Sequence, residues 1–182
     1  MGNFYLDIET TGLNPNIDEI ITIQFQELNM DGTVKGRLAI LKAWESSEKD
    51  ILNTFIRTSG INDKYPFAFV CVGYNLGFEH NFLRLRAEIH KLPIVDILNK
   101  PFIDLRAVGI IMNNGNFKGS GLDKITGKAS DGSQVPIWYK DKEYDKIIAY
   151  IENEAEEFIK FNSWLYGKLP PLLEEYKKEI KK

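Results

Sequence analysis

Two carboxylates lie near the start of the chain, in the stretch FYLDIETTGL at residues 4 to 13. In a β-strand successive side chains point to opposite faces, so Tyr5, Asp7 and Glu9 share one face, while Leu6 and Ile8 share the other. The residues that follow, TTGLNPN, are typical of a turn. The two acids therefore lie together where the strand ends, a placement that suits an open site.

A third carboxylate interrupts the apolar stripe of a predicted helix. Glu154 occupies the position that completes the helical spacing between Ile151 and Phe158, and Tyr150 lies one turn earlier on the same face. An unpaired buried charge costs several kcal/mol or is neutralised by a pKa shift, so Glu154 implies a cationic partner or a metal. The alternative for Glu154 is a solvated glutamate on the helix surface, and the alternative for Tyr150 is an ordinary core aromatic residue.

A fourth acid, Glu79, follows an apolar run in GYNLGFEHNFL, residues 73 to 83. By itself it is typical of an acid that stabilises a helix N-terminus. If it meets Asp7, Glu9 and Glu154, each pair about 4 Å apart repels by ~4 kcal/mol at an effective dielectric of 20, so such a cluster requires cations. Ligands that are all oxygen select hard ions, Mg²⁺ or Mn²⁺.

Alternating and continuous apolar runs predict the strands that position these acids. The expected strands cover residues 4–10, 19–30, 33–41, 67–73 and a short piece within 101–113. Asp31-Gly32 is a hairpin signal, so the first three strands should be antiparallel.

Helices are expected between and after these strands. The first begins at a capping pair, Ser47 and Asp50, and stops at Gly60. Others cover residues 78–89, a segment within 101–113, 122–126 and 142–165, the last ended by Gly167 and Pro170-Pro171. The order predicts an α/β fold, a mixed sheet of about five strands with helices on both faces.

Length and composition indicate one domain. The chain has 182 residues, of which 43% are hydrophobic and 27% charged, so one ordinary core is expected. We expect a domain over 1–166 and a charged helical tail over 167–182. Cys71 is the only cysteine, which excludes a disulfide framework and a cysteine zinc site and favours a cytoplasmic location.

Charge and hydropathy limit the partners. No apolar run approaches the ~20 residues needed to cross a bilayer, so no membrane partner is expected. The net charge of −3 argues against an extended basic surface for nucleic acid. Cations held by the acids would remove that objection, because they present positive charge to phosphate.

Three motifs give the sequence a family resemblance. LDIETTGL at 6–13 matches the first motif of the DEDD 3′-to-5′ exonuclease superfamily, and GYNLGFEHNFL at 73–83 resembles the second. YIENE at 150–154 resembles the third motif in its tyrosine form, the DEDDy type. Glu79 and Glu154 stand where the family has aspartate. SGLDKITGKASDGSQVPIWY also resembles the connection before the third motif in family-B polymerase proofreading domains and their free-standing relatives.

The resemblance implies a ribonuclease-H-like fold and assigns roles to single residues. Two divalent cations, Mg²⁺ or Mn²⁺, would be held by Asp7, Glu9, Glu79 and Glu154, and Tyr150 would orient the attacking water. The 3′-terminal nucleotide would be received by Thr10, Thr11, Gly12, Leu13 and Asn75.

The expected function is a metal-dependent 3′-to-5′ exonuclease that acts on single-stranded ends by a two-metal mechanism, with DNA favoured over RNA. One alternative is a catalytically impaired module on the same fold that binds nucleic acid or a partner protein. A second is a subunit that positions a polymerase or repair partner, for which the sequence offers no binding motif. The oligomeric state is left open.

Overall fold

A computed structural model describes residues 2–127 and 132–181. Its strands form one five-stranded sheet in the order β3-β2-β1-β4-β5. They are β1 (Asn3–Thr10), β2 (Ile20–Leu28), β3 (Ala39–Lys42), β4 (Val70–Gly73) and β5 (Phe102–Asp104). β1, β2 and β3 pair antiparallel, while β4 lies parallel to β1 and to β5. The predicted mixed α/β sheet with three antiparallel leading strands is confirmed.

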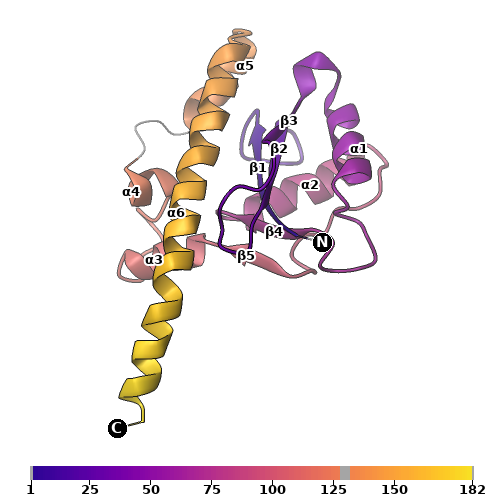
Figure 1. Ribbon diagram of the computed structural model, residues 1–182. Coiled ribbons are helices and arrows are strands. Elements are labelled where there is room, and N and C mark those ends of the chain that lie inside the picture. The colour runs from indigo at the N-terminus through magenta and orange to yellow at the C-terminus, as the bar shows by residue number, and fades with distance from the viewer. Residues whose placement is uncertain (1, 128–131, 182) are drawn as a thin grey trace.

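Helices cover both faces of this sheet (Figure 1). They are α1 (Glu48–Thr58), α2 (Gly77–Ile89), α3 (Arg106–Met112), α4 (Leu122–Thr126), α5 (Val135–Lys140) and α6 (Tyr144–Glu179), with 3₁₀ turns at Ala43–Glu45 and Gly132–Gln134. One apolar cluster joins the sheet to α1 and α2, and a second joins its other face to α4 and α6. The segment before α6 was expected to hold only the short helix α4, and α5 was not foreseen.

The alternation of β1 assigns its side chains to these two layers. Leu6 and Ile8 are buried in the cluster with α1 and α2. Tyr5 lies on the other face, where its ring is 4.7 Å from that of Phe158 in α6. Because Asp7 has the same parity as Tyr5, it faces α6.

The predicted helix start at Ser47 is confirmed. The Ser47 hydroxyl accepts a hydrogen bond from the Asp50 amide at 3.1 Å and donates one to the Asp50 carboxylate at 2.6 Å. The helix ends before Gly60, whose φ of +77° favours glycine.

Two strands are shorter than expected. The segment after the hairpin makes one isolated bridge, Leu28 to Val34, and becomes a strand only at Ala39. Two consecutive amides, of Lys35 and Gly36, both donate to the Glu27 carbonyl, which breaks the alternating ladder there. The apolar run 67–73 becomes a strand only at Val70, because a turn closes from the Ala68 amide to the Tyr65 carbonyl.

The predicted end of the last helix is wrong. α6 continues without a break through Gly167, Pro170 and Pro171 to Glu179. The prolines remove amide donors from one turn of the helix. That turn is exposed, so water can donate to the carbonyls that lose a partner.

From Gly167 onward every described residue is exposed, and this end of α6 projects away from the sheet in Figure 1. This exposure agrees with a tail that begins near residue 167, but α6 runs through that point without a break. The division into a domain and a tail at residue 166 remains a prediction. Within the described residues, no helix combines the length and apolarity needed to cross a membrane.

Candidate active site

A cluster of carboxylates forms where the end of β1 meets α6. Oxygen atoms of Asp7, Glu9 and Glu154 all lie within 4.8 Å of one another. Glu9 is 8% exposed, and the other two are partly buried. The spacing of two residues along β1 and the stripe of α6 bring these three predicted acids together.

The fourth predicted acid, Glu79, lies beside Asp7 but outside this group of three. It belongs to the first turn of α2, is 3% exposed and shares a hydrogen bond with Asp7. Burial and the neighbouring Asp7 raise its pKa well above the usual value. Its Oε2 atom is buried and has no hydrogen-bond partner within the described parts of the chain. An unsatisfied carboxylate oxygen beside the Asp7 carboxylate fits a site for hard cations.

Asp7 is held by its neighbours on the sheet. Gln24, its cross-strand partner in β2, donates to Asp7 Oδ2 at 2.8 Å, and the Tyr5 hydroxyl donates to the same atom at 3.3 Å. The Thr22 hydroxyl in turn donates to the side-chain oxygen Oε1 of Gln24 at 2.9 Å. Burial and the adjacent Glu154 raise the pKa of Asp7 to about 7, although the Gln24 hydrogen bond opposes the shift.

Gln24 was missed in the sequence. Its signal was the run of polar residues in β2, Thr22, Gln24 and Gln26, which alternates onto the face that carries Asp7. A fully buried polar side chain on a sheet face needs a partner.

Tyr150 lies between the core and the acids. Its ring packs 6.2 Å from that of Trp138, and its hydroxyl shares a hydrogen bond with Glu154. Burial and the nearby Glu154 and Glu9 raise the pKa of Tyr150 far above its usual value. The phenol therefore carries its proton at neutral pH and can orient a water molecule through it.

Replacing Tyr150 by phenylalanine should lower turnover by roughly 10- to 1000-fold, the usual size of a positioning contribution. The ring and its packing are kept, so the melting temperature should change little. Calorimetric titration with Mn²⁺ should show nearly unchanged metal affinity, because the hydroxyl is not one of the carboxylate ligands. A large loss of metal binding would mean that Tyr150 belongs to the metal site itself.

A cavity of about 490 Å³ adjoins the cluster at Glu9. Three of the predicted substrate-binding residues, Thr10, Gly12 and Leu13, line it, and Leu13 is 84% exposed. A Cβ atom at Gly12 would lie 2.4 Å from the Asp18 carboxylate, so a larger residue there would force the Asp18 side chain to move. This cavity has the place that the resemblance assigns to a terminal nucleotide.

The other two predicted substrate-binding residues lie elsewhere. Thr11 closes the loop: its amide donates to the Glu19 carbonyl at 2.9 Å, and its hydroxyl accepts from the Glu19 amide at 2.9 Å. Asn75, with φ of +73°, lines a second cavity. Asp104 fixes this turn by accepting hydrogen bonds from the Asn75 and Leu76 amides, at 2.8 and 3.0 Å.

The second cavity measures about 150 Å³ and adjoins the cluster at Asp7 and Glu154. Its other lining residues are Tyr5, Tyr74, Asn75, Arg106, Leu122 and Phe158. The two cavities share no lining residue, and each contains part of the carboxylate cluster.

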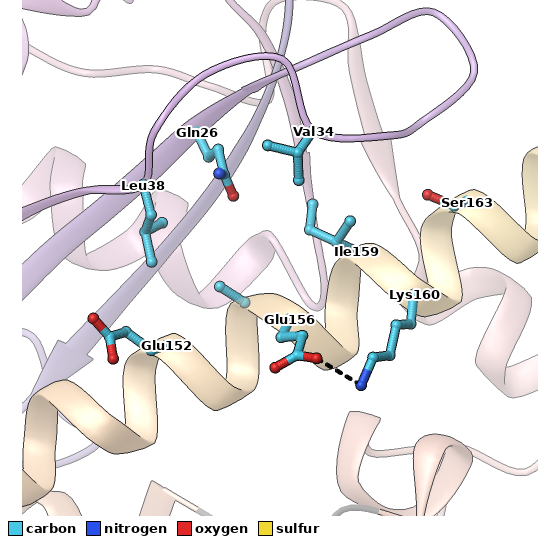
Figure 2. Close-up of a pocket in the computed structure, with 9 residues that line it drawn as sticks. Gln26, Val34, Leu38, Glu152, Glu156, Ile159, Lys160 and Ser163 are labelled. Atoms are coloured by element: carbon cyan, nitrogen blue, oxygen red, sulfur yellow. Dashed lines mark ion pairs between the residues drawn. The ribbon is translucent and has the colours of Figure 1, made fainter.

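A further groove runs along α6 but contains none of these acids. Figure 2 shows Gln26, Val34 and Leu38 on one side of it and side chains of α6 on the other. It measures about 440 Å³, and its Glu156 forms an ion pair with Lys160 at 2.9 Å. This groove contains none of the three carboxylates that could hold a metal ion together. The candidate active site is therefore the cluster at Asp7.

Comparisons with known proteins agree with this fold. A family model described as the RNase H superfamily matches residues 4–166. A zinc-bound complex of E. coli exonuclease I with single-stranded DNA is 12% identical, with a TM-score of 0.64 over 95% of this chain and 42% of that one. E. coli exonuclease I with a dT13 oligonucleotide is 13% identical, with a TM-score of 0.59 over the same shares. No curated protein sequence matches.

The chain thus spans less than half the length of these exonuclease I structures. At 12–13% identity the likeness is one of fold. The ribonuclease-H-like architecture that the three motifs implied is confirmed.

Proposed function

Because the chain belongs to the RNase H superfamily, we propose that it is a metal-dependent 3′-to-5′ exonuclease acting on single-stranded ends, with DNA favoured over RNA. The observation that carries the proposal is the meeting of Asp7, Glu9 and Glu154 within 4.8 Å, with Glu9 lining a cavity of about 490 Å³. A role in structure alone would not gather like charges beside an open cavity.

We assign the cations, Mg²⁺ or Mn²⁺, to Asp7, Glu9 and Glu154, with Glu79 completing the site beside Asp7. Two ions held there would supply the Lewis-acid chemistry of phosphodiester hydrolysis, activating a water and stabilising the departing 3′ oxygen. The chain's own contribution is to hold the carboxylates in place, through Gln24 at Asp7, and to orient the water through the Tyr150 hydroxyl.

The first cavity suits the base and sugar of a terminal nucleotide. Leu13 and Phe78 give it apolar surface, and stacking on such surfaces binds single strands without reading their sequence. The exonuclease I complexes contain DNA oligonucleotides, and this supports DNA as the substrate proposed for the present chain.

The proposal predicts a ladder of products. With a 5′-labelled single strand and Mg²⁺ or Mn²⁺, shortening should proceed from the 3′ end and stop when a chelator is added. Mn²⁺ should give the faster rate, because Glu79 and Glu154 each carry one methylene more than aspartate and Mn²⁺ accepts looser geometry than Mg²⁺. A parallel RNA strand measures the preference between the two substrates. Internal cuts, or cleavage that survives the chelator, would contradict the proposal.

One observation favours a second candidate, a catalytically impaired binding module. Glu79 lies outside the group of three acids, and two of the four acids are longer than the family's aspartates. Such a module would bind the labelled strand without shortening it in either metal. A polymerase or repair partner belongs to this candidate as well. The free, buried thiol of Cys71 supports a reducing, cytoplasmic setting for either one.

A further inference from the structure

Arg106 brings a positive charge to the wall of the smaller cavity, which Asp7 and Glu154 also line. It begins α3 and lines the same 150 Å³ space as Asp7 and Glu154. Its guanidinium carbon lies 4.0 Å from the centre of the Phe117 ring, a cation–π contact that fixes the plane of the group. Neither the motifs nor the resemblance assigns it a role.

The Arg106 guanidinium donates no hydrogen bond to any residue in the described parts of the chain. Its Nε atom is buried and has no acceptor in the described chain, and none of the residues 2–127 and 132–181 forms an ion pair with it. A buried donor left without an acceptor costs about 1–3 kcal/mol. The Nε donor is thus positioned and desolvated with no acceptor among the described residues, while the side chain as a whole is only partly buried.

The position of Arg106 indicates which kind of ligand it would bind. An anion in this cavity would lie within the same small space as the Arg106 guanidinium and the cations that Asp7 and Glu154 would hold. A planar guanidinium pairs best with carboxylate or phosphate oxygens. Since the neighbouring acids are assigned to a phosphodiester, the fitting anion is another phosphate of the same strand.

The two cavities then order the strand. The terminal nucleotide occupies the cavity of Leu13, which adjoins the acids at Glu9, and the scissile phosphate lies at the carboxylates. The strand continues into the cavity that adjoins Asp7 and Glu154, where Arg106 and Asn75 are found. The next phosphate in the 5′ direction is therefore the one within reach of Arg106.

We propose that Arg106 binds the second phosphate from the 3′ end of a single strand, one nucleotide upstream of the scissile bond. The inference rests on the proposed function and deepens it, because it makes the substrate a strand of at least three nucleotides. It also explains why the guanidinium is held on Phe117 with an unused donor.

The test pairs a change in the protein with a change in the strand. A 5′-fluorescein hexathymidylate is compared with the same strand carrying an uncharged methylphosphonate at the second phosphate from the 3′ end. Each is titrated with wild type and Arg106→Gln by fluorescence anisotropy. Ca²⁺ fills the oxygen ligands, and gels verify that the strand stays intact. Arg84→Gln, an exposed arginine on α2, and a methylphosphonate at the fifth phosphate are the matched controls.

Arg106→Gln and the methylphosphonate should each weaken binding about tenfold, in the range of a charge-assisted hydrogen bond, and together no more than either alone. The slope of log affinity against log salt should fall by ~0.7 for Arg106→Gln and stay unchanged for Arg84→Gln. The assignment would be overturned if the losses of affinity from Arg106→Gln and from the methylphosphonate multiplied when combined. It would also be overturned if Arg106→Gln bound the unmodified strand as tightly as wild type. If Arg106→Gln melts well below wild type, Arg106→Met, which keeps the aliphatic packing and lacks the charge, replaces it, and the same cycle decides.

The outcome for the proposed function is separate. If wild type binds the hexamer but never shortens it in Mg²⁺ or Mn²⁺, the exonuclease proposal fails while the binding cycle still decides on Arg106. If wild type does not bind the hexamer, both fail.

Discussion

Asp7→Asn should abolish nuclease activity and yet make the metal-free protein more stable. Turnover should fall by about 1000-fold, the upper end of what one electrostatic group contributes. Asparagine keeps the oxygen that accepts the Gln24 hydrogen bond at 2.8 Å and removes one charge beside Glu154. At pH 8 in chelator we expect a gain of roughly 1 to 3 kcal/mol in the free energy of unfolding, about 2–4 °C in melting temperature per kcal/mol.

The pKa of Asp7 sets the pH dependence of this gain. Burial and Glu154 raise that pKa from 3.8 to about 7, so between these values the folded protein binds more protons at Asp7 than the unfolded chain. This contribution to stability is complete below about pH 4 and is lost as pH rises through 7. The advantage of Asp7→Asn should therefore be well below its full size at pH 5 and nearly full at pH 8.

Thermal melts at both pH values, in chelator and in Mn²⁺, check the prediction. Added Mn²⁺ should stabilise wild type more than Asp7→Asn, since a ligand stabilises the state that binds it. Glu152→Gln, an exposed acid of α6 two residues before Glu154, is the control and should change neither activity nor melting. A lower metal-free melting temperature for Asp7→Asn, with activity retained, would exclude the metal-site interpretation.

Glu48→Gln should destabilise the protein by about 3–5 kcal/mol, the usual cost of breaking a buried ion pair. Glu48 is 7% exposed and accepts hydrogen bonds from Arg86 at 2.6 and 2.8 Å and from His90 at 2.6 Å. Burial raises the pKa of Glu48, but the hydrogen bonds from Arg86 and His90 outweigh it and leave the pKa below its usual value. Glutamine would leave the buried Arg86 charge without its carboxylate.

The same network holds the loop between β1 and β2. Glu48 also accepts from the Ile20 amide at 2.8 Å, and Arg86 donates to the Pro15 carbonyl at 3.4 Å. Glu48→Gln should therefore raise the KM for the strand as well, because Leu13 of this loop lines the nucleotide cavity.

Denaturant titrations compare Glu48→Gln with Glu45→Gln, whose side chain is 60% exposed and pairs with Lys42 at 2.6 Å. Exposed pairs contribute about 0–1 kcal/mol, so this control should unfold near the wild-type midpoint. Equal midpoints for both variants would show that the buried pair adds nothing to stability.

The sequence by itself determined the features that depend on local periodicity. The alternation of β1 put Asp7 on one face and Leu6 on the other, and the stripe of α6 put Glu154 beside the core. The cap at Ser47 and the five-residue helix α4 were likewise foreseen. Each of these rests on neighbours within a few residues, where side-chain direction follows from backbone geometry.

Tertiary structure decided which distant residues meet. Gln24 reaches Asp7 only through the register of β1 and β2, and Glu48 meets Arg86 across 38 residues. The place of Asn75 in the second cavity, and of Arg106 beside it, depends on how β4 and β5 end together. These contacts follow from the packing of whole elements rather than from any local pattern, because a side chain's partners across a sheet or between layers are set by register and crossing position.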